Sequence, residues 1–175
     1  YQAEKNGLTG SVDVEYVSEH AEAVTQMAAG SADLILVPEP FVTTALSKVE
    51  GARVALDLTQ EWAKVSDADM VMGCLVVSKA FAEADPQALR HFMTQYAVSA
   101  DYCTSHPAEA AVFIEEFGIM GSAALAEKAI PNCNIVCVTG REMVDMVTGM
   151  LAVLFDADPK SVGGSLPGEE MFWLG

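Results

Sequence analysis

Short apolar runs alternate with amphipathic helix patterns along the chain, and this alternation restricts the possible folds more than any other feature. The run Ala32–Val37 is almost continuously apolar, as is typical of a strand covered on both faces. Comparable runs cover residues 12–17, 53–58, 70–77 and 133–138. Strands that alternate with helices are typical of a sheet with crossover helices. The sequence therefore predicts an α/β fold, with a mixed or parallel sheet and flanking helices, followed by a helix-rich second half.

Capping residues and proline mark where the helices are expected to begin. Asp85 followed by Pro86 supplies an N-cap and a proline at the first helical position, and Thr139 with Glu142 matches a capping box. Ser18 is the N-cap expected for the first of the longer helices. The predicted helices cover residues 18–28, 41–48, 86–100, 107–117, 122–129 and 139–158.

The charge balance excludes one class of partner. The 175 residues include 25 acidic and 9 basic side chains, which gives a formal net charge of -16. Nucleic-acid binding depends on clusters of Lys and Arg, and the sequence contains no basic run. No apolar run approaches the roughly 20 residues that a membrane helix needs. We therefore expect a soluble domain that does not bind nucleic acid.

Motifs for catalysis or metal binding are missing from the sequence. It contains no GxSxG, no Walker A sequence, no GxGxxG after a strand and no HExxH. The four cysteines, Cys74, Cys103, Cys133 and Cys137, form no CxxC pair, and we expect them to be small core residues, with their disulfide status open. These observations predict no catalytic residues, no metal and no cofactor, and a protein that is not an enzyme.

Two loops stand out as candidate binding segments. Ser18-Glu19-His20 follows a predicted strand and opens a helix, where free N–H groups and the helix dipole favour a polar ligand. Pro38-Glu39-Pro40-Phe41 follows the most apolar predicted strand. Ligands of open α/β sheets bind outside the carboxyl ends of the strands, so both loops lie at the expected binding edge.

The same segments carry a resemblance to a known family. The sequences YVSEHAEAVTQMAAGSADLILVPEPFVTTAL, VALDLTQEW, MGCLVVSKAFAEADPQALRHFMTQY and DADPKSVGGSLPGEEMFW are similar to the second half of ABC-importer substrate-binding proteins. The subgroup in question takes nitrate, sulfonates, taurine or thiamine precursors of the pyrimidine type. The VPEPF turn and the MGCLVV strand are the most specific parts of this resemblance, which runs through nearly the whole chain.

The resemblance implies a two-lobed fold of the type II periplasmic-binding-protein class, with a ligand cleft between the lobes. Residues 1–75 would form most of the second lobe, and residues 76–175 would cross back to the first, whose N-terminal half and leader would lie upstream of this chain. The protein would be extracytoplasmic, in the periplasm or as a lipoprotein on the cell surface. It would capture a small-molecule solute and deliver it to an ABC permease, its membrane partner.

The resemblance also implies which residues face the ligand. Ser18 and His20 would exchange hydrogen bonds with it, and Glu39 would accept a bond from an amine or amidine, or else hold the hinge. Phe41 and Trp62 would form an apolar wall. The complete set of expected ligand contacts is Ser18, His20, Glu39, Phe41, Trp62, Met72, Gly73 and Cys74.

Two other functions remain open at this point. One is an enzyme of the same superfamily that resembles a pyrimidine-precursor synthase, and the other is the ligand-sensing lobe of a signalling protein. The identity of the solute is also open, although the presence of only three arginines argues mildly against a purely anionic ligand. If part of the fold lies outside this chain, uncovered apolar surface would favour self-association.

Overall fold

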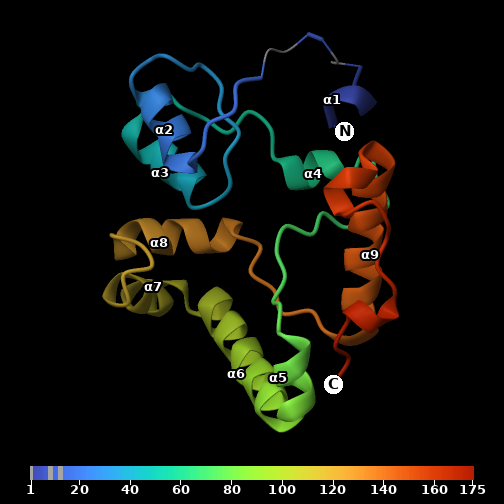
Figure 1. The fold of residues 1–175 in the computed structure, drawn as a ribbon. Helices are drawn as coiled ribbons and strands as arrows, with labels where there is room; N and C mark the ends of the chain where they lie inside the picture. Colours follow the sequence, from blue (N-terminus) through green and yellow to red (C-terminus); the bar gives the residue numbers. More distant parts are fainter. Residues whose placement is uncertain (1, 8–9, 12–13) are drawn as a thin grey trace. The chain divides into compact units, whose positions relative to one another are not determined.

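The computed structural model describes residues 2–7, 10–11 and 14–175. The backbone of these residues consists of helices joined by loops (Figure 1). No helix among these residues is both long and apolar enough to cross a membrane. In chain order the helices are α1 (Gln2–Lys5), α2 (His20–Ala28), α3 (Phe41–Lys48), α4 (Leu58–Trp62), α5 (Lys79–Ala84), α6 (Pro86–Ser105), α7 (Pro107–Glu116), α8 (Ala123–Ala129), η1 (Ile130–Asn132), α9 (Gly140–Ala157), η2 (Pro159–Val162) and η3 (Glu169–Met171).

The chain forms two compact units, each assembled from separate stretches of sequence. Unit 1 comprises residues 1–13, 56–94 and 138–175, and unit 2 comprises residues 14–55 and 95–137. Helix α6 contributes its first half to unit 1 and its second half to unit 2. From the sequence, we expected one lobe to end at residue 75 and the other to begin at residue 76. That division refers to a longer two-lobed protein and stays a prediction.

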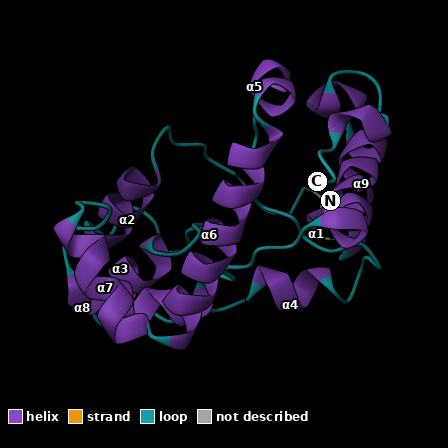
Figure 2. Cartoon of the chain, turned by 90° about the horizontal axis from the view of Figure 1, so that it is seen from below, coloured by secondary structure: helices purple, strands orange, loops and turns teal. Residues whose placement is uncertain are grey.

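The prediction of an α/β sheet is wrong for the described residues, which contain no strand (Figure 2). Loops take the place of the predicted strands at residues 14–17, 32–37, 53–57, 70–77 and 133–138. Residues 12 and 13 of the first predicted strand lie outside the described part. Leu34 and Leu36 are 74% and 76% exposed. An apolar run indicates a tendency to be buried, but a strand also needs a neighbour with which to exchange backbone hydrogen bonds. These segments have no such neighbour within the described chain.

The helix predictions were more accurate, because their signals are local. Helices α3, α6, α7, α8 and α9 begin within one residue of the predicted positions. Asp85 Oδ1 accepts a hydrogen bond from the backbone N–H of Ala88 at 2.9 Å, and Ser122 Oγ accepts one from Leu125 at 3.4 Å. The capping box predicted at Thr139 is wrong, since the side chain of Thr139 makes no capping bond to α9.

The core of unit 2 lies between helices α7 and α8, which run side by side (Figure 1). Its buried residues are mostly alanines, and half-buried side chains including Cys103, Ile114 and Ile135 pack against it. Helix α3 packs on α8 and on α2. Small side chains let helices approach closely, and they leave little room for a larger residue. The buried members of this core are Ala110, Ala111, Ala126 and Ile130.

We expect the substitution Ala126→Leu to destabilise unit 2. Ala126 is fully buried, so three added carbon atoms must displace neighbours in α7, which costs about 1–3 kcal/mol of unfolding free energy. Urea denaturation followed by circular dichroism measures this change. Ala124→Leu is the matched control, because Ala124 lies in the same helix and is exposed. Equal stability of the two variants would contradict this description of the core.

Unit 1 is organised around Trp62, which is buried at the end of α4. Its indole N–H donates a hydrogen bond to the backbone carbonyl of Ala68. Ala68 in turn lies against Gly149 of α9, where a Cβ atom would come within 3.2 Å of the Ala68 Cβ. Trp62 therefore holds the loop after α4 in the position where it packs closely on α9.

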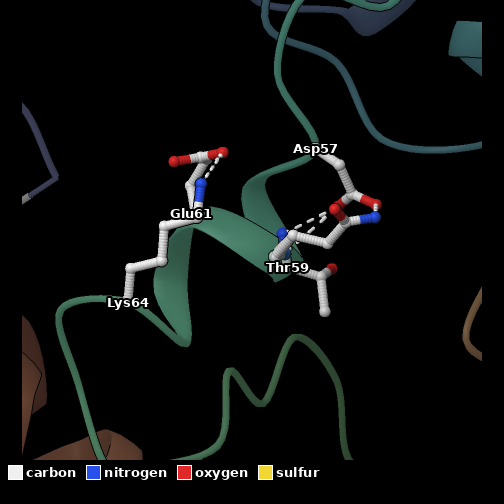
Figure 3. A network of polar contacts seen from close by, with 5 residues as sticks. Asp57, Thr59, Glu61 and Lys64 are labelled. Carbon is white, nitrogen blue, oxygen red and sulfur yellow. Dashed lines mark hydrogen bonds and ion pairs between the residues drawn. The ribbon is translucent and has the colours of Figure 1, made fainter.

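The start of α4 is fixed by a local polar network (Figure 3). Asp57 Oδ1 accepts hydrogen bonds from the backbone N–H groups of Thr59 at 2.9 Å and Gln60 at 3.4 Å, and the side chain of Gln60 donates to Asp57 Oδ2 at 3.0 Å. Lys64 Nζ forms an ion pair with Glu61 at 2.7 Å. This N-cap satisfies first-turn N–H groups in a helix of five residues, which has few internal bonds of its own.

Candidate functional site

Two aromatic rings from different helices meet in unit 2. The ring centroids of His20, at the start of α2, and Phe41, at the start of α3, lie 5.2 Å apart with an interplanar angle of 39°. This separation is within the range of favourable aromatic contacts. His20 is exposed and Phe41 is half-buried, so the pair combines an imidazole open to solvent with an anchored apolar ring. Both residues were predicted as ligand contacts, and the structure brings them together.

The residues before α2 leave polar groups exposed. The structure has Glu19 at the N-cap without a capping side-chain bond, so the expectation that Ser18 caps this helix is wrong. Ser18 lies two residues before His20, and both are exposed. The start of α2 therefore has no side-chain cap from Glu19, and the exposed Ser18 and His20 offer a hydroxyl and an imidazole on either side of this residue.

Glu39 makes its contacts within its own helix start. The backbone N–H of Thr43 donates to Glu39 Oε2 at 3.0 Å, and the Thr43 hydroxyl donates to Oε1 at 3.1 Å. Pro40, at the N-cap of α3, supplies no capping side chain. Glu39 therefore acts as the cap from one residue further back. The two roles expected for Glu39, a bond to an amine or amidine and a tie at the hinge, both stay predictions.

A half-buried thiol lies within electrostatic reach of Glu39. Burial raises the pKa of Cys133 above its ordinary value, and the negative charges of Glu39 and Cys103 raise it further. The Cys133 thiol donates to the carbonyl of Ala129 at 3.2 Å. Because burial and these charges disfavour the thiolate, the raised pKa has no effect on stability below the unfolded-state pKa of about 8.5 and lowers the stability of the folded state as the pH rises through the folded value. Cys133 is thus a weakly nucleophilic thiol at neutral pH.

We expect iodoacetamide at pH 7.5 to modify Cys133 more slowly than Cys74, which is exposed. Mass spectrometry of tryptic peptides over time measures both rates. Glu39→Gln removes one of the negative charges that disfavour the thiolate, so it should speed modification of Cys133 and leave the rate at Cys74 unchanged. Modification of Cys133 at the rate of Cys74 would contradict the environment described for this thiol.

The cysteines differ from the expectation that all four are core residues. Cys74 is exposed, whereas Cys103, Cys133 and Cys137 are half-buried. None of the four forms a disulfide in the described structure. No group of three or more His, Cys, Asp or Glu side chains in residues 2–7, 10–11 and 14–175 could hold a metal ion.

The other predicted ligand contacts belong to unit 1. Met72, Gly73 and Cys74 are exposed in the loop before α5, and Trp62 is buried with its N–H bonded to Ala68. The Trp62 ring thus packs inside its unit. A role for these four residues in ligand binding stays a prediction.

Unit 1 also contains an open cavity of about 720 Å³ beside α9. Arg141, at the start of this helix, forms ion pairs with Asp145 at 3.4 Å and with Glu169 of η3 at 2.8 Å. The hydrogen bond to Glu169 and the charges of Asp145 and Glu169 raise the pKa of Arg141. The guanidinium therefore links the C-terminal segment to α9. The cavity is lined by Asp67, Ala68, Asp69, Arg141, Glu142, Asp145, Met146 and Gly149.

Comparison with known families identifies the group to which the chain belongs. Residues 7–130 match the family model described as menaquinone biosynthesis, so the chain is a member of that family. The matched range includes the whole of the His20–Phe41 site and most of unit 2. No curated protein matches the sequence.

A solved structure shows which fold the chain resembles. The crystal structure of an ABC transporter from Parabacteroides distasonis superposes with a TM-score of 0.71 and 23% sequence identity, over 98% of this chain. The match covers 61% of that protein, so the chain spans about three fifths of its length. At this identity the similarity concerns the path of the chain alone.

The family match corrects the function expected from the sequence. Assignment as the solute-binding component of an ABC importer is wrong, and so are the expected permease partner and the conclusion that the protein is not an enzyme, because the family is a biosynthetic one. The alternative of a biosynthetic enzyme was closer, although it named a pyrimidine pathway. The extracytoplasmic location stays a prediction.

Proposed function

We propose that this protein is an enzyme of menaquinone biosynthesis, and that its substrate binds at the His20–Phe41 site. The observation that carries the proposal is the family match over residues 7–130. Menaquinone contains a planar naphthoquinone ring, so an intermediate in its synthesis has cyclic, unsaturated carbon that can stack on an aromatic side chain.

The chemistry of the site suits a planar substrate with polar substituents. Phe41 offers a half-buried ring face, and His20 an exposed imidazole 5.2 Å from it. Imidazole is the side chain best matched to proton transfer near neutral pH. Ser18 adds a hydroxyl close to His20 in the sequence. We assign Phe41 to ring stacking, His20 to proton transfer, and Ser18 to a hydrogen bond with a polar substituent.

A thermal-shift panel on the purified protein tests the proposed substrate class. Naphthoates and benzoates represent planar aromatic acids, while taurine, an alkanesulfonate and nitrate represent the solutes of importers. A ligand at a hundredfold excess over its Kd stabilises the folded state by about 2.7 kcal/mol. We expect a shift with a planar acid that is reduced in Phe41→Ala and retained in Phe113→Ala, which removes an exposed phenylalanine of α7. A shift with taurine or nitrate alone would contradict the proposal.

A further inference from the structure

Thr43 is the one buried polar side chain among the residues that the structure describes, and both of its hydrogen-bond donors go to Glu39. Buried polar groups are costly without partners, and bonds to a carboxylate are stronger than bonds between neutral groups. Each oxygen of Glu39 accepts one bond from Thr43, so the two bonds together fix the orientation of the carboxylate. The pair is therefore a rigid local structure.

The Glu39–Thr43 pair flanks Phe41 in the sequence. Phe41 lies midway between the two partners and is the first residue of α3. Its backbone N–H donates to the carbonyl of Pro38 at 2.9 Å, which closes a turn that includes Glu39. The direction of a side chain at the first helical position depends on the backbone of that turn, so the Glu39–Thr43 pair lies where it can influence the direction of the Phe41 ring.

We propose that Thr43 is a positioning residue for the site, which acts through Glu39 to hold the ring of Phe41 against His20. The positioning of the ring is inferred from the structure alone. Its effect on substrate binding rests on the proposed function. Thr43 is buried and both of its bonds go to Glu39, so the role assigned to it is one of positioning. The role explains why a buried position in a short helix carries threonine instead of an apolar residue of the same size.

The test compares Thr43→Val with Thr43→Ser. Valine keeps the size and the backbone N–H but removes the hydroxyl donor, whereas serine keeps the donor. Proton NMR of the His20 imidazole reports the geometry directly, because the Phe41 ring shifts its resonances; Phe41→Leu gives the reference position without this ring. We expect Thr43→Val to move the His20 signals toward that reference and Thr43→Ser to leave them near the wild-type position.

Binding of a naphthoate supplies the second readout. We expect its Kd to rise about three- to tenfold in Thr43→Val, because the lost hydrogen bond affects the ligand only through the position of the ring, and to recover in Thr43→Ser. A folded Thr43→Val protein with wild-type His20 signals would overturn the proposal. If the wild-type protein binds no naphthoate, the proposed substrate class fails, while the NMR comparison still decides the positioning role.

Glu39→Gln gives an independent test if Thr43→Val does not fold. Glutamine keeps an oxygen acceptor and loses the negative charge, so the cap is weakened without a change in size. We expect the His20 signals to move part of the way toward the Phe41→Leu reference. Unchanged signals in a folded Glu39→Gln protein would show that the Glu39–Thr43 pair does not set the position of the ring.

Discussion

Replacing Trp62 by alanine is expected to lower the free energy of unfolding by about 3–5 kcal/mol, the usual range for removal of a buried tryptophan. The loss has two sources. The cavity left by the indole removes packing from the end of α4, and the carbonyl of Ala68 loses its donor. Since Ala68 packs against Gly149, the contact of this loop with α9 is weakened as well.

Urea denaturation followed by circular dichroism at the helix band measures the effect of Trp62→Ala. Trp62→Phe reduces the cavity, because it keeps a six-membered aromatic ring while it removes the N–H with the rest of the five-membered ring, so we expect a smaller loss of about 1–2 kcal/mol. Trp173→Ala is the control for a half-buried tryptophan near the C-terminus. A loss below that of Trp173→Ala would contradict the central place given to Trp62 in unit 1.

Replacing His20 by alanine is expected to reduce the rate of menaquinone formation about a hundredfold, within the range for loss of a general acid or base. The reason is that His20 supplies the proton-transferring group of the proposed site, next to the ring on which the substrate stacks. A strain that lacks the chromosomal gene, supplied with each variant at low and equal expression, reports the rate as newly formed menaquinone.

The control for His20→Ala is His91→Ala, since His91 is an exposed histidine of α6. It should leave the rate unchanged. His106 is a less suitable control, because its ring stacks on Tyr102 with centroids 4.8 Å apart. A rate within twofold of wild type for His20→Ala, with normal protein abundance, would remove His20 from the proposed mechanism and leave the family membership untouched.

The helices were predictable from the sequence and the sheet was not, for a physical reason. Asp85 before Pro86 and Ser122 before α8 cap their helices through bonds within a few residues, so the sequence alone contains the information. A strand at residues 32–37 depends on a partner segment from elsewhere. The run is apolar, but both conclusions drawn from it were wrong, since Leu34 and Leu36 are exposed and the described residues there form a loop.

The sequence singled out several residues of the candidate site, but it did not predict the bonds that hold them. His20, Glu39 and Phe41 were expected as ligand contacts, and this role stays a prediction, although the structure brings the rings of His20 and Phe41 together. Thr43 was missed, although the sequence holds a signal: proline at the N-cap of α3 cannot cap the helix, so a side-chain cap there requires a neighbouring residue. Glu39 and Thr43, four residues apart across that start, fit this requirement.

The function predicted from the sequence was wrong because the resemblance to importer proteins is consistent with a shared fold and does not identify a function. The solved ABC transporter structure shares the path of this chain at 23% identity, which is consistent with similar turns and helices. One fold hosts many functions, so such segments do not distinguish a carrier from an enzyme. The discriminating evidence is the family match over residues 7–130.

The most direct test of the central claim is the menaquinone content of cells from which the gene has been deleted, measured by liquid chromatography and mass spectrometry. We predict that menaquinone disappears and returns when the gene is restored on a plasmid. Uptake of labelled taurine, an alkanesulfonate and nitrate, measured in the same cells, should not change. Normal menaquinone together with lost uptake of one of these solutes would contradict the biosynthetic function.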